Sequence, residues 1–167
     1  ISTDDFYADL APISWFEREL YVPDLALGRL VEEPSEIEGL IDRFMSNDTL
    51  DPADALVSGY DFLSDGADAI ATKLEAVVPS VDRSLISDTW TRGDVCDTLD
   101  LECGTGTATP DIDSLNAHYD HYRLLPAAYV GDLDPGDLVT TADIPVENSG
   151  DDRFNGSVFF SMGCHSG

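Results

Sequence analysis

Three short stretches carry residues suited to nucleophilic chemistry, and each follows an apolar run typical of a buried strand. ALVSGYD ends at Asp61, DSLNAH ends at His118, and SVFFSMGC ends at Cys164. A cysteine thiolate is a strong nucleophile, a histidine can take up the thiol proton, and a carboxylate can orient the imidazole. An acid, a histidine and a cysteine at three strand ends form the set that thiol-dependent catalysis needs, with Gly163 leaving room for a substrate. The alternative is an inert, buried cysteine that only packs as a small hydrophobic residue, which is the commoner role of a cysteine at a strand end.

The run HYDH (118–121) also allows a zinc site. Its two histidines and Asp120 stand close together, and Cys164 or His165 would complete a set of four ligands. Asn116 stands where such a run needs its first histidine, and the sequence holds no second histidine cluster. A zinc hydrolase is therefore the weaker interpretation of this run.

Alternating apolar runs and helical patterns predict an α/β fold with a parallel sheet and crossover helices. Strands or extended segments are expected over 20–30, 55–62, 84–90, 113–122 and 157–163, and helices over 34–44 and 65–78, with shorter helical turns at 92–100 and 140–144. Ser35 and Glu38 form a capping-box signature at the start of the first helix. In a parallel sheet, ligands bind beyond the carboxyl ends of the strands, where Asp61, His118 and Cys164 are expected to meet.

The composition is that of a folded protein with one substantial core. With 167 residues, of which 43% are hydrophobic, the sequence predicts a single domain over residues 1–167. It contains no unbroken apolar run of the roughly 18–20 residues that a membrane span needs, so membrane insertion is not expected. The chain begins at Ile1 without a signal-like segment. We therefore expect a fragment of a longer extracellular or cell-surface precursor, with other domains of that precursor as partners.

The charge balance is strongly acidic. Thirty-four aspartate and glutamate residues stand against eight basic ones, of which Lys73 is the single lysine, so the formal net charge is −26. Such a surface repels nucleic acid and anionic lipid, and neither is an expected partner. Self-repulsion of this size is tolerable in molar salt, where the Debye length falls to about 3 Å. The composition therefore favours a high-salt environment.

Calcium binding is the rival explanation of the acidity. DLDPGD (132–137) and ENSGDD (147–152) offer carboxylates, but neither has the ligand spacing of a helix–loop–helix calcium site. Solvated turns are the favoured interpretation, and a structural calcium ion is the one cofactor that the sequence leaves open.

The three cysteines divide into a close pair and a single residue. Cys96 and Cys103 either form a small disulfide, as in an exported protein, or remain two thiols beside the loop that follows. If they pair, Cys164 is left over and needs its own explanation.

The order of these segments resembles that of the gingipain-like cysteine peptidases, which belong to the caspase-like clan. The resemblance covers nearly all of the chain: PDLALGRL before a helix with IDRF, ALVSGYDF with its acidic helix, a strand leading to a histidine, and TTADI before an apolar strand ending in Gly-Cys. It implies a caspase-like three-layer sandwich, in which helices flank a mostly parallel central sheet. It also implies an endopeptidase that hydrolyses polypeptides through a cysteine and a thioester acyl-enzyme.

Carried over residue by residue, the resemblance makes Cys164 the nucleophile and His118 the histidine, 46 positions earlier. Asp61 falls about where the family has an acid that supports the histidine. Asp65 is nearest to the acid that receives a basic substrate side chain. Gly163 precedes the nucleophile, and its backbone belongs to the region that holds the oxyanion.

One position departs from the family pattern. The family histidine is usually followed by glycine, whereas Tyr119 follows His118 here. His121 is the alternative base, but the predicted strand places His118 directly after the apolar residues and so favours it. The leading prediction is a Cys164–His118 dyad oriented by Asp61. The alternative is a catalytically silent caspase-like module of a surface protein, with a binding or structural role, because Tyr119 replaces the glycine that leaves room for substrate.

Overall fold

The chain divides into two compact units in the computed structural model. Unit 1 comprises residues 1–50 and unit 2 comprises residues 51–167. The structure describes residues 7, 9–22, 24, 33–46, 51–106, 108–120, 122–128, 137–144, 154 and 156–162. Among these residues, no helix is both long enough and apolar enough to cross a bilayer. A single domain over residues 1–167 stays a prediction.

Unit 1 contains a short hairpin and one helix. Strands β1 (Ile13–Trp15) and β2 (Arg18–Leu20) pair antiparallel. Phe16 and Glu17 between them both have positive φ, as in the hairpin turn that matches the twist of paired strands. Helix α2 (Pro34–Ser46) confirms the helix predicted over 34–44.

Two details of unit 1 differ from the sequence predictions. Helix α2 begins at Pro34, so Ser35 lies inside its first turn and not at the cap. Proline suits the first helical position, because an N–H group there has no partner within the helix. Of the segment predicted as extended over 20–30, the structure describes only 20–22 and 24, and β2 ends at Leu20.

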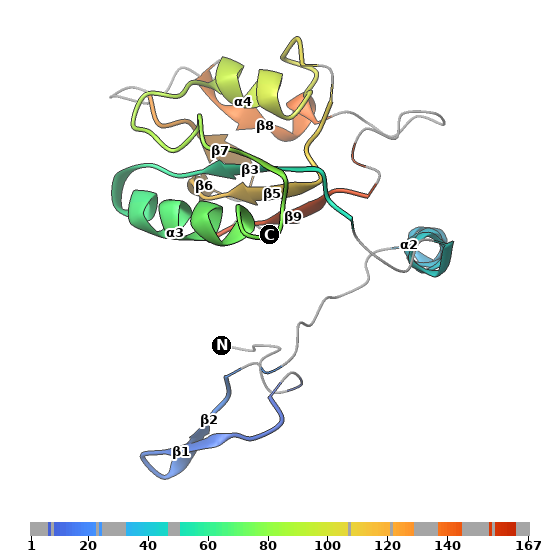
Figure 1. The fold of residues 1–167 in the computed structure, drawn as a ribbon, viewed down its shortest axis with the longest axis vertical. Coiled ribbons are helices and arrows are strands. Elements are labelled where there is room, and N and C mark those ends of the chain that lie inside the picture. The colour runs from blue at the N-terminus through green and yellow to red at the C-terminus, as the bar shows by residue number, and fades with distance from the viewer. Residues whose placement is uncertain are drawn as a thin grey trace. The chain divides into compact units, whose positions relative to one another are not determined.

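Unit 2 is built on a four-stranded, fully parallel sheet, which confirms the predicted α/β class (Figure 1). Its strands in spatial order are β4 (Ser80–Asp82), β3 (Asp54–Ser58), β5 (Ile112–Leu115) and β9 (Val158–Phe160). The helices that flank it are α3 (Ser64–Leu74) and α4 (Arg92–Thr98). Because all four strands run in one direction, their carboxyl ends lie at the same edge.

The two helices lie on opposite faces of this sheet (Figure 1), because successive residues of a strand point to opposite sides. Val57 belongs to the core cluster that contains Ala67 of α3. Its neighbour Leu56 belongs to the larger cluster that contains Val95 of α4. Gly59, just beyond β3, allows α3 to approach closely, since a Cβ there would lie 2.4 Å from the Ala67 Cβ.

The segment 113–122 is not the single strand that the sequence predicted. β5 ends at Leu115, and the chain then enters a second, antiparallel sheet. That sheet consists of β6 (His118–Asp120), β7 (Arg123–Leu125) and β8 (Val139–Thr140), in this order. The change of sheet occurs at Asn116, a fully buried residue whose side chain bonds across to β3 instead of facing solvent.

The strand predicted over 84–90 is wrong. The chain forms β4 earlier, at Ser80–Asp82, and residues 83–90 have irregular backbone, in which Ile86 makes a single parallel bridge with Gly59. Leu85 and Trp90 are nevertheless buried in the α4-side core. Their apolar side chains indicate that these positions are buried, but a residue can be buried without belonging to a strand.

The other predicted elements of unit 2 are present with shorter bounds. The run 55–62 continues past β3 into a 3₁₀ turn, η1 (Asp61–Leu63), and α3 ends at Leu74, before the predicted end at residue 78. The helical turn expected over 140–144 is the 3₁₀ turn η3 (Thr141–Asp143).

Cys96 and Cys103 form a disulfide, which decides between the two alternatives that the sequence left open. Their Cα atoms are 5.4 Å apart. The loop that follows packs tightly on α4, since a Cβ at Gly104 would lie 2.3 Å from the Cys96 carbonyl oxygen. The pairing leaves Cys164 as the one cysteine of the sequence outside a disulfide.

Candidate functional site

Residues from three neighbouring strands converge at the carboxyl edge of the parallel sheet. β3 leads to Asp61, β5 leads to His118, and β9 leads to Met162, the last described residue before Cys164. These strands are adjacent in the order β3-β5-β9. Convergence of these segments at one edge is the arrangement in which parallel α/β sheets form their ligand sites.

Asn116 connects the three strand ends through its buried side chain. Its Nδ2 donates to the Ser58 carbonyl oxygen at 3.0 Å and to Ser114 Oγ at 2.8 Å. Its Oδ1 accepts the Met162 N–H at 3.0 Å. Asn116 therefore holds the start of the segment that leads to Cys164 against the ends of β3 and β5.

His118 and Asp61 face each other across this edge. Nε2 of His118 lies 3.7 Å from Oδ2 of Asp61, which is ion-pair range but longer than a hydrogen bond. Both side chains reach solvent, with 39% of His118 and 67% of Asp61 exposed. Because Nε2 faces Asp61, Nδ1 is the imidazole nitrogen that remains to interact with a thiol or a substrate.

The backbone of Asp61 is held in an uncommon conformation. Its φ is +53°, in the left-handed region that aspartate tolerates better than most residues. The Asp61 N–H donates to Asp88 Oδ1 at 2.9 Å, and its carbonyl oxygen accepts Ser64 Oγ at 3.0 Å. Strained residues that are fixed in this way often occur at functional sites, so the feature supports a role for Asp61.

Two aromatic rings flank the His118 imidazole. The Tyr60 and Phe62 rings both meet it edge to face, with ring centroids 5.2 and 5.4 Å away. The Tyr60 hydroxyl donates to the Leu125 carbonyl oxygen at 2.7 Å and accepts the His118 N–H at 3.2 Å. Burial raises the pKa of Tyr60 and keeps it a neutral donor. These contacts fix both the backbone and the ring position of His118.

Tyr119 turns away from the His118 imidazole, because neighbouring residues of β6 point to opposite sides. Its hydroxyl donates to the Leu115 carbonyl oxygen at 2.9 Å, and its ring packs against the α4-side core. Burial raises the pKa of Tyr119 to about 12. The Tyr119 side chain therefore lies on the far side of the strand from the imidazole.

A buried carboxylate lies at the centre of the same sheet. Asp113 of β5 is fully buried, and within the described part of the chain neither of its oxygens has a hydrogen-bond partner. Burial, together with the nearby charges of Asp54 and Asp111, raises the pKa of Asp113 to about 8. It is therefore a neutral acid over most of the physiological range, in the middle of β5 and paired with Phe159 of β9.

Several predicted site residues lie outside the described residues: Gly163, Cys164, His121 and His165. The same holds for most of the two acidic turns, 132–137 and 147–152. Asp65 is exposed in the first turn of α3. Within the described part of the chain, no group of three or more His, Cys, Asp or Glu side chains is arranged to hold a metal ion. The zinc and calcium interpretations stay predictions.

Sequence reasoning missed two residues that build this site. In the sequence, Asn116 stands out only as a missing metal ligand, and Tyr60 only as part of an apolar run. The sequence signal for Asn116 is a polar side chain that directly follows an apolar strand, because such a residue must find partners if it is buried.

Comparison of the chain with models of protein families, with curated proteins and with solved structures gave no significant match.

Proposed function

We propose that unit 2 is a caspase-like cysteine endopeptidase domain of the gingipain-like type. The observation that carries the proposal is the His118–Asp61 pair at the carboxyl edge of the parallel sheet. The chain leaves β9 at the same edge, four residues before Cys164. The parallel sheet with helices on both faces is compatible with a caspase-like sandwich.

In the proposed reaction, His118 takes the thiol proton of Cys164, and the thiolate attacks the carbonyl carbon of the scissile peptide bond. Backbone N–H groups around Gly163 hold the oxyanion. The C–N bond then breaks as His118 returns the proton to the leaving amine, which leaves a thioester. Water attacks the thioester, gives its proton to His118, and releases the acid product and the thiol. Asp61 orients the imidazole and stabilises its protonated form.

Two features of the described site support this function over a silent module. The imidazole is accessible, so a substrate can reach it. Tyr119, the departure that favours a silent module, is directed into the core and away from the imidazole.

Alkylation of the full chain with iodoacetamide at pH 6 tests the proposal. Cys96 and Cys103 are paired, so Cys164 is the thiol that reacts. We expect it to react at least about tenfold faster than a cysteine in an unfolded peptide, because a nearby imidazolium lowers its pKa. His118→Ala and Asp61→Asn should slow the reaction, whereas His121→Ala should not.

Hydrolysis of a casein-derived peptide mixture gives the second measurement. Cys164→Ser should abolish cleavage, and His118→Ala should lower kcat by about 10²–10⁴-fold. If Cys164 reacts no faster than an ordinary thiol, and Cys164→Ser leaves hydrolysis unchanged, the proposal is wrong. If His121→Ala has the larger effect, His121 is the base. Activity that depends on stoichiometric zinc and is lost with EDTA would instead support the zinc hydrolase.

A further inference from the structure

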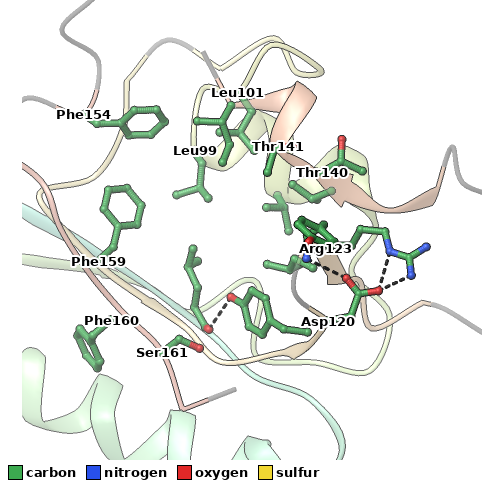
Figure 2. A pocket seen from close by; sticks show the side chains of 17 residues that line it. Leu99, Leu101, Asp120, Arg123, Thr140, Thr141, Phe154, Phe159, Phe160 and Ser161 are labelled. Atoms are coloured by element: carbon green, nitrogen blue, oxygen red, sulfur yellow. Dashed lines mark hydrogen bonds and ion pairs between the residues drawn. The ribbon is translucent and has the colours of Figure 1, made fainter. Parts of the chain in front are cut away.

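An apolar pocket of about 690 Å³ lies on the α4 face of the parallel sheet (Figure 2). Its volume falls in the range of about 300–1,000 Å³ that is typical of ligand sites. The walls come from four places: α4, the end of β5, the second sheet with η3, and the edge strand β9. Figure 2 shows Phe154 and Phe159 on one side of the cavity, with Leu99 and Leu101 across from them.

The pocket is lined by sequence neighbours of the proposed catalytic residues. Tyr119 lines it and directly follows His118 in β6. Ser161 also lines it and stands three positions before Cys164. Because the Tyr119 side chain points away from the imidazole, a side chain in the pocket lies at the carboxyl edge of the sheet, across β6 from the His118 ring.

The lining is nearly neutral although the chain carries a net charge of −26. Asp120 and Arg123 are the charged residues among the described lining, and they form an ion pair with each other. This pairing leaves no net charge to attract a lysine or arginine side chain into the pocket. The remaining lining is mostly aromatic and aliphatic, which favours a large apolar group.

We propose that this pocket binds a large aromatic or branched aliphatic side chain of a polypeptide substrate that crosses the carboxyl edge of the sheet. The inference rests on the proposed function for its substrate, but the binding preference can be measured without hydrolysis. It differs from the expectation that Asp65 receives a basic side chain. Asp65 lies on α3, which covers the opposite face of the sheet.

The net charge adds a second preference. An acidic surface attracts neutral or basic chains and repels acidic ones, so residues that flank the apolar side chain are expected to be uncharged or basic. The preferred substrate is then an extended, non-acidic polypeptide segment with a central Phe, Tyr, Leu or Ile.

Four fluorescein-labelled peptides with identical uncharged flanks test this inference in the full chain. Their central residues are Phe, Leu, Arg and Ala. Binding is measured by fluorescence anisotropy with Cys164→Ser, which is expected not to cleave them, and kcat/KM is measured with the unaltered protein. We expect the Phe and Leu peptides to bind at least about tenfold more tightly than the Ala peptide, because even one methylene that fills an apolar pocket improves binding by about tenfold or more.

A variant that fills the pocket and a matched control test whether the preference for Phe over Ala arises in this pocket. Thr141 lines the pocket and is exposed, so Thr141→Trp should fill it and reduce the Phe-over-Ala ratio to near one. Ala142 is the exposed neighbour outside the lining, and Ala142→Trp should leave the ratio unchanged. If Thr141→Trp fails to fold by circular dichroism, Phe159→Ala, which removes one wall, should lower the ratio instead.

The outcomes separate the two proposals. A Phe preference in binding without hydrolysis of any peptide overturns the peptidase proposal and leaves the pocket assignment standing. Equal binding of all four peptides, no binding, or a preference for Arg overturns the pocket assignment. So does a Phe preference that Thr141→Trp and Ala142→Trp reduce equally.

Discussion

His118 and Asp113 carry the two ionisable groups that matter most in unit 2, and their surroundings are opposite. His118 reaches solvent beside an acid, so it can exchange protons with a substrate. Asp113 is buried in the sheet and has no hydrogen-bond partner among the described residues, so ionising it costs free energy. The surroundings of His118 suit proton transfer in a reaction, whereas the burial of Asp113 makes the stability of the fold depend on pH.

Asp113→Asn should stabilise the protein at neutral and alkaline pH. The folded pKa of Asp113 is about 8 against 3.8 for the free side chain, so between these values the folded state holds a proton that the unfolded state releases. The contribution of Asp113 to the free energy of unfolding therefore falls as pH rises from about 4 to 8. The fall is at most about 1.4 kcal/mol per pH unit. An asparagine does not ionise, so this fall should disappear in the variant.

Thermal unfolding at pH 4, 6 and 8 in constant salt measures this effect. The difference in Tm between Asp113→Asn and the unaltered protein should grow with pH. Asp51→Asn, at an exposed position, is the control and should show a constant difference. Parallel pH curves for Asp113→Asn and the unaltered protein would contradict the prediction.

Among the elements, the parallel sheet and the segment after β9 are joined by one side chain. Asn116 bonds to the Ser58 carbonyl oxygen and to the Met162 N–H, so it connects β3, β5 and the approach to Cys164. Strand pairing alone would fix β9 only as far as Phe160. The bonds of Asn116 extend this order two residues further.

Asn116→Ala should destabilise unit 2 by about 2–3 kcal/mol, because it leaves buried donors and acceptors without partners. Urea denaturation measures the loss. Hydrogen exchange of the Met162 amide measures the positioning role, and the amide should exchange faster. Asn116→Asp keeps an acceptor for that amide, so it should restore most of the protection without restoring full stability.

The control for this series is Ser58→Ala, which removes only a 3.5 Å contact to the Asn116 carbonyl oxygen. It should change stability little. Unchanged Met162 exchange in Asn116→Ala would show that other contacts position the segment.

For the whole molecule, the net charge of −26 is the dominant property. Self-repulsion between carboxylates opposes the compact state, and salt screens it. We predict that Tm rises by several degrees as NaCl increases from 0.1 to about 2 M, since the Debye length falls from about 10 Å to below 3 Å. Differential scanning calorimetry in NaCl and KCl of equal ionic strength measures this, and the two salts should agree.

The same experiment tests the calcium alternative. Millimolar CaCl₂ at constant ionic strength should leave Tm unchanged if screening is the cause. A rise in Tm that saturates at low calcium concentration would instead indicate a specific site, as expected from preferential binding to the folded state.

The sequence by itself determined the α/β class and the residues that follow the strands. Apolar runs bounded by turn residues located β3, β5 and β9, and helical spacing located α2 and α3, because these patterns depend on local burial. Because parallel strands end at the same edge of a sheet, the sequence predicted that Asp61 and His118 would meet. In the structure, Nε2 of His118 lies 3.7 Å from Oδ2 of Asp61. The cysteine at the third strand end lies outside the described residues, so its place in the site stays a prediction.

Only the tertiary structure decided which partners the polar residues find. Residues 84–90 carry strand-like apolar residues but bury them from irregular backbone, and a local pattern does not distinguish these outcomes. The break at Asn116, the Cys96–Cys103 pairing and the pocket beside Tyr119 each join residues that are separate in the chain. Local sequence reports whether a side chain is buried, whereas packing in three dimensions determines what it is buried against.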